Sequence, residues 1–119
     1  MYRFEKLRVY NNATGLVEEI YKLLKNFPKE ERFALGDQLK RSSTSIVLNI
    51  AEGSVGFSDL EFKRFLRISL RSLYETVAGL KLAEKLFGVE TNSALEKCDV
   101  VGKEIMALIK SLNQTANDH

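Results

Sequence analysis

The stretch QLKRSSTSIVLNIAEG, residues 38–53, decides how the rest of the chain is interpreted. It contains four consecutive hydroxyl residues, whose side chains compete for backbone hydrogen bonds inside helices. Its apolar residues nevertheless recur at helical spacing, with Leu39, Ile46 and Ile50 on one stripe. Small and polar residues run along the edge of that stripe, and we assign to them a structural polar motif of Gln38, Arg41, Ser45, Asn49, Glu52 and Gly53. The pattern predicts a helix that packs closely on another helix through a hydrogen-bonded seam.

Glu52 lies near the C-terminal end of this helix, where the helix dipole disfavours a carboxylate. It therefore needs a cationic partner, which could be Arg41 or a residue of another helix or subunit. Asn49 and Glu52 then have two interpretations. They either form a structural hydrogen-bond network that closes the helix, or they contact a ligand or RNA at the helix end.

Working outward, the apolar spacing predicts three further helices and no strand, because no segment alternates with a period of two. The four expected helices cover about residues 5–26, 28–55, 59–87 and 94–112 of a single domain, 1–119. Pro28 is suited to a first helical position, and Gly88 to the end of the third helix. Short connections between amphipathic helices favour an all-α, antiparallel up-and-down four-helix bundle.

The third and fourth helices each begin with a capping signal. Ser58 and Glu61 have the spacing of a capping box, and Phe57 and Phe62 that of a hydrophobic staple around it. Ser93 starts a second capping box in the sequence Ser-Ala-Leu-Glu. The two helices should therefore start close to these serines.

Composition argues against conventional enzyme chemistry. The only histidine is His119, at the end of the chain, and the only cysteine is Cys98, at core spacing on the last helix. We interpret Cys98 as a small buried hydrophobe in preference to a nucleophile, because no base accompanies it in sequence. No metal-ligand or phosphate-binding motif is present, so we expect no enzyme, metal, cofactor or small-molecule substrate.

The length and hydropathy of the chain favour a cytoplasmic protein. No apolar run approaches the roughly 20 residues of a membrane span, and the first ten residues lack the apolar core of a signal peptide. The net charge of +2 does not by itself indicate nucleic-acid binding.

The distribution of charge is more informative. Residues 57–87 carry six Lys or Arg against four Asp or Glu. The candidate nucleic-acid-binding residues are Lys63, Arg64, Arg67, Arg71, Lys81 and Lys85. They form either an ordinary solvated helix face or a surface that follows phosphates, with binding that weakens as salt rises.

Apolar residues beyond the core stripes predict an interface between copies of the chain. The candidate oligomer-interface residues are Leu48, Val55, Leu82 and Leu86. They predict a self-assembling ring or dimer.

With these residues in view, the sequence resembles the family of 23S ribosomal-RNA intervening-sequence proteins. The resemblance rests on residues 27–32, Leu35, 38–42, 45–46, 49–53, Phe62, 65–66, 69–70, 72–73 and Glu75. Its most specific part is Asn-Ile-Ala-Glu-Gly at 49–53. A departure occurs at Val47-Leu48, where the family often has Pro or a small residue followed by Ser.

The resemblance implies a cytoplasmic bacterial bundle that assembles as a homopentamer and is linked to ribosomal RNA. Similar bundles serve as accessory proteins of diversity-generating retroelements. Our leading hypothesis is a non-enzymatic, ring-forming bundle that binds RNA or an RNA-bound protein through its third helix. The alternative is a structural scaffold that binds only protein partners.

Overall fold

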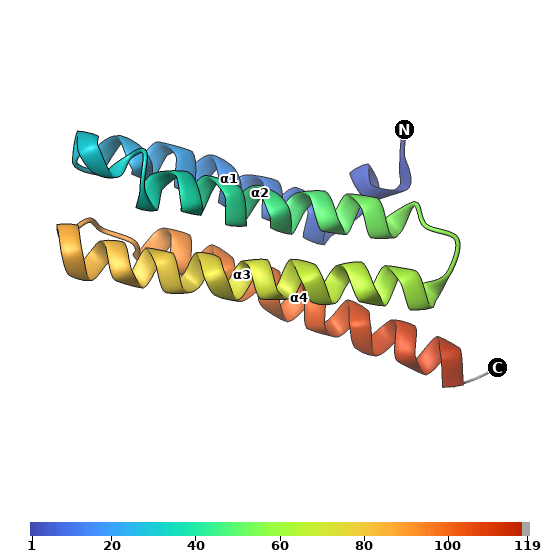
Figure 1. Ribbon diagram of the computed structural model, residues 1–119. Helices are drawn as coiled ribbons and strands as arrows, with labels where there is room; N and C mark the ends of the chain where they lie inside the picture. The colour runs from blue at the N-terminus through green and yellow to red at the C-terminus, as the bar shows by residue number, and fades with distance from the viewer. Residues whose placement is uncertain (118–119) are drawn as a thin grey trace.

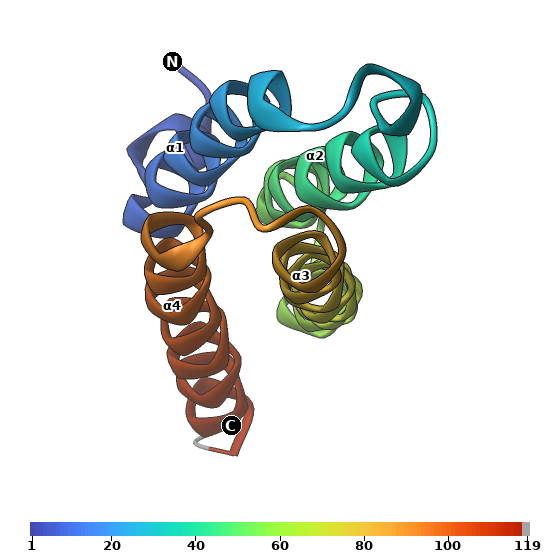
Figure 2. The ribbon, with the colours of Figure 1, turned by 90° about the vertical axis from the view of Figure 1, so that its left-hand side faces the viewer.

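Four long helices make up most of the protein in the computed structural model, which describes residues 1–117, with side chains through residue 114. They are α1 (Arg8–Leu23), α2 (Leu35–Ser54), α3 (Asp59–Phe87) and α4 (Asn92–Asn117). Successive helices run in opposite directions, and the second half of α4 diverges from α1 and α2 (Figure 1). Seen end-on, each helix neighbours the two next to it, with α1 beside α2 and α4, and α3 beside α2 and α4 (Figure 2). The predicted all-α four-helix bundle is confirmed.

The first helix is shorter than the expected 5–26. The chain begins with a 3-10 turn, η1 (Arg3–Lys6), and then passes through Leu7 in an extended conformation before α1 starts. A second 3-10 turn, η2 (Leu24–Asn26), ends this segment before the extended Phe27. The residue that precedes a proline avoids the helical region, so Phe27 marks the true end of the segment.

The second helix does not start at Pro28, and the expectation of a helix over 28–55 is wrong at its N-terminal end. Pro28 precedes a 3-10 turn, η3 (Lys29–Glu31), and the helix begins only at Leu35. Arg32 holds this connection against the end of the first helical segment, because its Nη2 donates to the carbonyl oxygen of Lys25 at 2.9 Å. The chain needs these residues to reverse direction, and α2 spans about 30 Å instead of the expected 42 Å.

The bounds of α3 agree with the prediction of 59–87. The Ser58 hydroxyl accepts a hydrogen bond from the backbone N–H of Glu61 at 3.1 Å. At the other end Gly88 adopts a φ of 68°, a conformation that favours glycine. The predicted staple does not form, because the Phe57 side chain is fully exposed while that of Phe62 is only 2% exposed.

The fourth helix is longer than the expected 94–112. It starts at Asn92, so Ser93 lies within its first turn instead of capping it. The Glu90 carboxylate accepts the backbone N–H of Asn92, and the Thr91 hydroxyl donates to the carboxylate of Glu84 on α3, each at 2.8 Å. The Glu90 bond takes the place of the predicted serine cap, and the Thr91 bond ties the start of α4 to α3.

The core lies along the axis of the bundle and uses the predicted apolar stripes. Its largest fully buried hydrophobic side chains have less than 2% of their surface exposed, apart from Phe62 at 2%. They are Leu16, Ile20, Leu39, Ile46, Ile50, Phe62, Leu66, Leu80, Val101 and Ile105. In the described residues, no helix has the length and apolarity that a membrane crossing requires.

Candidate nucleic-acid interface

Two residues of the hydroxyl run on α2, Ser42 and Ser45, face α3 and form the seam between the two helices. Ser42 and Thr76 hydrogen-bond to each other at 2.8 Å, and Ser45 and Ser72 do the same at 2.8 Å. Ser69 donates to the backbone carbonyl of Ile46, also at 2.8 Å. These bonds satisfy the hydroxyls of Ser42 and Ser45 across the interface, whereas Ser43 and Thr44 donate to the backbone carbonyl of Lys40 within α2. The seam therefore aligns the two helices in one register.

Glycines at both ends of the seam allow the helices to approach closely. A Cβ atom on Gly53 would lie 2.6 Å from the Cβ of Phe65. On α3, a Cβ atom on Gly79 would lie 2.8 Å from the Cδ2 of Leu39. Both distances are shorter than real Cβ contacts. A larger residue at Gly53 would force the helices apart, whereas at Gly79 the Leu39 side chain would have to shift.

Three of the six residues of the polar motif form hydrogen bonds or packing contacts within the protein, and the other three are exposed. Asn49 donates to the backbone oxygen of Ser45 at 2.8 Å and to its hydroxyl at 3.0 Å, and Gly53 packs on α3. The other three, Gln38, Arg41 and Glu52, are exposed, and their side chains form no hydrogen bond or ion pair with the described residues.

Arg41 and Glu52 are not the pair that the sequence suggested. They are eleven residues apart on one helix, which separates them by about 16 Å along its axis. Asn49 also bonds back to Ser45 and not to Glu52. The expected hydrogen-bond network between Asn49 and Glu52 at the helix end is therefore not formed, and Glu52 faces solvent.

The six basic residues of α3 lie on the outer side of the bundle. Five of them are exposed, and Lys63 is half-buried because it donates to the Asn113 side chain of α4 at 2.7 Å. Among the described side chains the ion pair is Lys97 with Glu19 at 3.6 Å, so no carboxylate pairs with any of the six. Arg64, Arg67 and Arg71 are grouped within eight residues, whereas Lys81 lies about 15 Å beyond Arg71 along the helix.

Sequence reasoning missed two cations of α4 that extend this surface. A Cβ atom on Gly102 would lie 2.9 Å from the Leu73 side chain, and Asn113 bonds to α3, so these turns of α4 lie against α3. Lys103 follows Gly102, and Lys110 lies one turn before Asn113; both are exposed. We call Arg67, Arg71, Lys103 and Lys110 the α3–α4 basic face. Their grouping depends on which turns of the two helices meet, which the sequence does not state.

The candidate oligomer-interface residues are all exposed but form two separate groups. Leu48 lies on α2 at about the same level along the bundle as Ile68 on α3, because both are within two residues of the hydrogen-bonded pair Ile46 and Ser69. Leu82 lies thirteen residues beyond Ser69, about 20 Å further along α3, and Leu86 one turn beyond that. Val55 belongs with the first group, at the end of α2.

A shallow apolar groove extends from Leu48 toward α1. It has a volume of about 280 Å³ and lies between α1 and α2. Its lining residues are Tyr10, Thr14, Val17, Thr44, Val47 and Leu48. Sequence reasoning did not include the α1 residues, since it did not specify which face of α1 lies beside α2.

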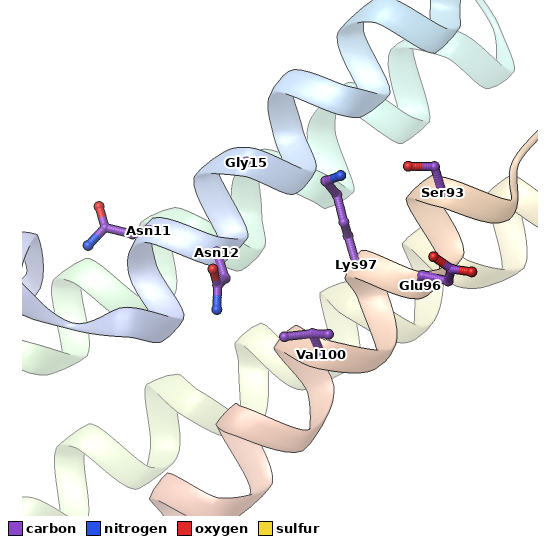
Figure 3. Close-up of a pocket in the computed structure, with 7 residues that line it drawn as sticks. All are labelled: Asn11, Asn12, Gly15, Ser93, Glu96, Lys97 and Val100. Atoms are coloured by element: carbon purple, nitrogen blue, oxygen red, sulfur yellow. The ribbon is translucent and has the colours of Figure 1, made fainter.

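A polar hollow of about 340 Å³ separates α1 from α4 next to Gly15, where Lys97 reaches from α4 toward α1 (Figure 3). Two of its polar side chains already have partners in the protein. Lys97 pairs with Glu19, and Asn12 donates to the carboxylate of Glu104 at 2.8 Å. The side chains of Ser93 and Glu96 form no hydrogen bond or ion pair with the described residues, but both are exposed, and two surface groups do not make the convergent set that usually marks a ligand site.

The remaining candidates for chemistry are Cys98, possible metal ligands and His119. Burial, followed by the nearby carboxylate of Asp99, raises the pKa of the Cys98 thiol to about 12, so the thiol is neutral near pH 7. In the described residues, no three His, Cys, Asp or Glu side chains are grouped so that they could hold a metal ion. His119 lies outside the described residues.

The fold and its surface define a class of protein: an all-helical bundle whose third helix presents unpaired basic residues outward. The sequence model of the 23S rRNA-intervening sequence protein family matches residues 5–111. The chain therefore belongs to that family, as the residues at 49–53 suggested.

A solved structure shows the same fold. It is a protein of unknown function from the S23 ribosomal protein family of Bacteroides thetaiotaomicron, with a TM-score of 0.63 and 24% sequence identity. The similarity covers 90% of this chain and 96% of that chain. No curated protein matches the sequence.

Proposed function

We propose that this protein is a non-enzymatic, self-associating bundle that binds RNA through the basic residues of α3. The observation that carries the proposal is the group of exposed, unpaired arginines Arg64, Arg67 and Arg71. Cations that no carboxylate neutralises attract phosphates over the length of the helix. Membership of a family named for its location within 23S rRNA supports RNA as the partner.

Self-association would strengthen such a surface. One copy offers few phosphate contacts, but several copies joined in one assembly bind a long RNA with a higher overall affinity. The family resemblance favours a homopentamer, whose mass would be about 67 kDa, five times 13.5 kDa. The exposed Leu48 and Ile68, with the apolar groove between α1 and α2, are the surface we propose for contact between copies.

Charge reversal on α3 should weaken RNA binding. We expect Arg67→Glu with Arg71→Glu to lower the affinity for a structured RNA at least tenfold at low salt. The slope of log K against log salt should fall by about two, because two phosphate contacts are lost. Fluorescence anisotropy of a labelled RNA, titrated between roughly 50 and 200 mM salt, measures both quantities.

The matched control is Lys22→Glu with Lys29→Glu, which changes the net charge equally but alters exposed lysines outside α3. It should retain most of the affinity of the unmodified protein. If the two double variants lose affinity equally, binding reflects net charge and not the α3 surface. Undetectable binding by the unmodified protein at low salt would reject the RNA proposal.

Disruption of the Leu48 surface should reduce the size of the assembly. We expect Leu48→Glu to shift the protein toward its 13.5 kDa monomer, because a buried unpaired carboxylate is strongly unfavourable. Multi-angle light scattering over a wide range of protein concentrations measures the mass. Val100→Glu places the same charge at an exposed apolar position of α4 and serves as the control.

A monomeric unmodified protein at every concentration would contradict self-association. A stable oligomer that Leu48→Glu leaves intact would show instead that a different surface joins the copies.

A protein-only scaffold is the second candidate function. It is favoured by exposed apolar residues at both ends of α2, where Phe33, Val55 and Phe57 contact little of the chain. The same RNA titration separates the two functions, since a scaffold would assemble without any salt-dependent affinity for RNA.

A further inference from the structure

Tyr74 continues the line of basic residues along α3. Arg67, Arg71 and Tyr74 follow one another at spacings of four and three residues, which places them on neighbouring turns of one helix face. The Tyr74 side chain is 57% exposed. In the described residues its ring stacks on no other ring or cation, and its hydroxyl forms no hydrogen bond. An aromatic ring beside cations is therefore free to meet a partner.

The surroundings of Tyr74 leave room for an extended ligand. Ala78, the next residue along this face, is small and exposed. Beyond it, a hollow of about 550 Å³ between α3 and α4 includes Lys81, Lys85 and Asn92 in its lining. Its carboxylate, Glu84, already accepts a hydrogen bond from Thr91. Cations thus lie on both sides of the ring, and Arg67 and Lys85 are about 27 Å apart along the helix.

The position of the ring distinguishes between forms of RNA. A duplex presents phosphates and 2′-hydroxyls and keeps the faces of its bases stacked inside, so an exposed tyrosine adds little to its binding. An unpaired segment offers base faces, on which aromatic side chains stack, while neighbouring cations contact the phosphates. The exposed Tyr74 ring therefore fits an unpaired strand better than a duplex. Five cations surround it: Arg67, Arg71, Lys81, Lys85 and Lys103.

We infer that the α3–α4 basic face, together with Lys81 and Lys85, binds an unpaired segment of RNA, with one base stacked on Tyr74. Arg67, Arg71 and Lys103 contact the phosphates on one side of that base, and Lys81 and Lys85 those on the other. Asp99 lies one turn before Lys103 on α4 and limits the positive charge of that helix at the level of the ring. The inference rests on the proposed function and adds the structural class of RNA that the surface selects.

A tyrosine substitution separates base stacking from phosphate binding. With a labelled single-stranded RNA of about 15 nucleotides, Tyr74→Ala should weaken binding about tenfold. The same RNA annealed to its complement should bind the variant within about twofold of the unmodified protein. Tyr74→Phe keeps the ring and should retain single-strand affinity, and Tyr21→Ala, which removes an exposed tyrosine of α1, should change neither affinity.

Because the sequence contains no tryptophan, Tyr74→Trp introduces one fluorescent reporter at the proposed contact. Its emission should be quenched by the single strand and little affected by the duplex. The inference is overturned if Tyr74→Ala keeps full single-strand affinity or if the single strand leaves the reporter unchanged. In that case, RNA binding that still depends on Arg67 and Arg71 would leave the proposed function intact. If the unmodified protein binds neither RNA, the inference and the proposed function are both rejected.

Discussion

Gly53→Ala should lower the free energy of unfolding by about 2 kcal/mol, although alanine is the better helix former. The added Cβ would lie 2.6 Å from the Cβ of Phe65 and 3.0 Å from the Cδ1 of Phe62. A Cβ atom is attached directly to the backbone and cannot rotate away, so the two helices must separate. Separation would also lengthen the hydroxyl bonds of the seam, such as Ser45 with Ser72. Chemical denaturation followed by circular dichroism measures the change.

Gly15→Ala is the matched control for this experiment. It makes the same substitution inside α1, where an added Cβ would have no atom within 4 Å. Only the helix propensity changes there, so we expect a gain of roughly 0.5–1 kcal/mol. Both variants must be compared at one protein concentration, because self-association would alter the apparent stability. If both substitutions stabilise the protein equally, the close approach at Gly53 does not exist in solution.

The parts of the fold that could be predicted are those that short-range signals specify. The bounds of α3 follow from Ser58, whose hydroxyl caps the helix, and from Gly88, whose positive φ ends it. Both signals act within four residues, so they do not depend on the rest of the structure. The core was predictable for a similar reason, because helical spacing places Ile46 and Ile50 on one buried stripe.

The start of α2 could not be predicted because it depends on chain reversal. Nothing between Pro28 and Leu35 breaks a helix locally, and a continuous helix satisfies the apolar spacing. The chain must nevertheless turn back along α1, and it does so through η3 and the bond from Arg32 to Lys25. One result is that Phe33 is exposed at the turn, whereas a continuous helix over these residues gave no reason to expect an exposed phenylalanine there.

The candidate interface was predictable along one helix but not across two. The spacing of Arg67 and Arg71 showed that they share a face of α3, whatever surrounds it. Lys103 and Lys110 join them only because Gly102 packs on Leu73 and Lys63 bonds to Asn113. The failed pairing of Arg41 with Glu52 has a different cause, because eleven residues along one helix already place the two side chains about 16 Å apart, a separation that helical spacing alone predicts.

Phe62→Ala should cost about 3–5 kcal/mol and lower the melting temperature by roughly 10–20 °C. The Phe62 ring is 2% exposed, and a methyl group would leave a cavity between the start of α3 and the end of α2. The ring also helps to hold the N-terminal turn, since the Arg3 guanidinium lies over it at 5.4 Å from the centroid. Arg3 in turn donates to the carbonyl of Ser54 at 3.2 Å, so the truncation should loosen η1 as well.

Phe57→Ala is the control, and it tests a feature on which sequence and structure disagree. The spacing of Phe57 and Phe62 predicts a staple across the Ser58 cap, in which both rings contribute to stability. The structure instead exposes Phe57 fully, and truncation of an exposed side chain usually changes stability by less than about 0.5 kcal/mol. Thermal melts of the two variants at low protein concentration would decide between these arrangements. If Phe57→Ala lowers the free energy of unfolding by more than about 1 kcal/mol under those conditions, the staple forms. A loss of stability that appears only at high protein concentration would instead place Phe57 in the contact between copies.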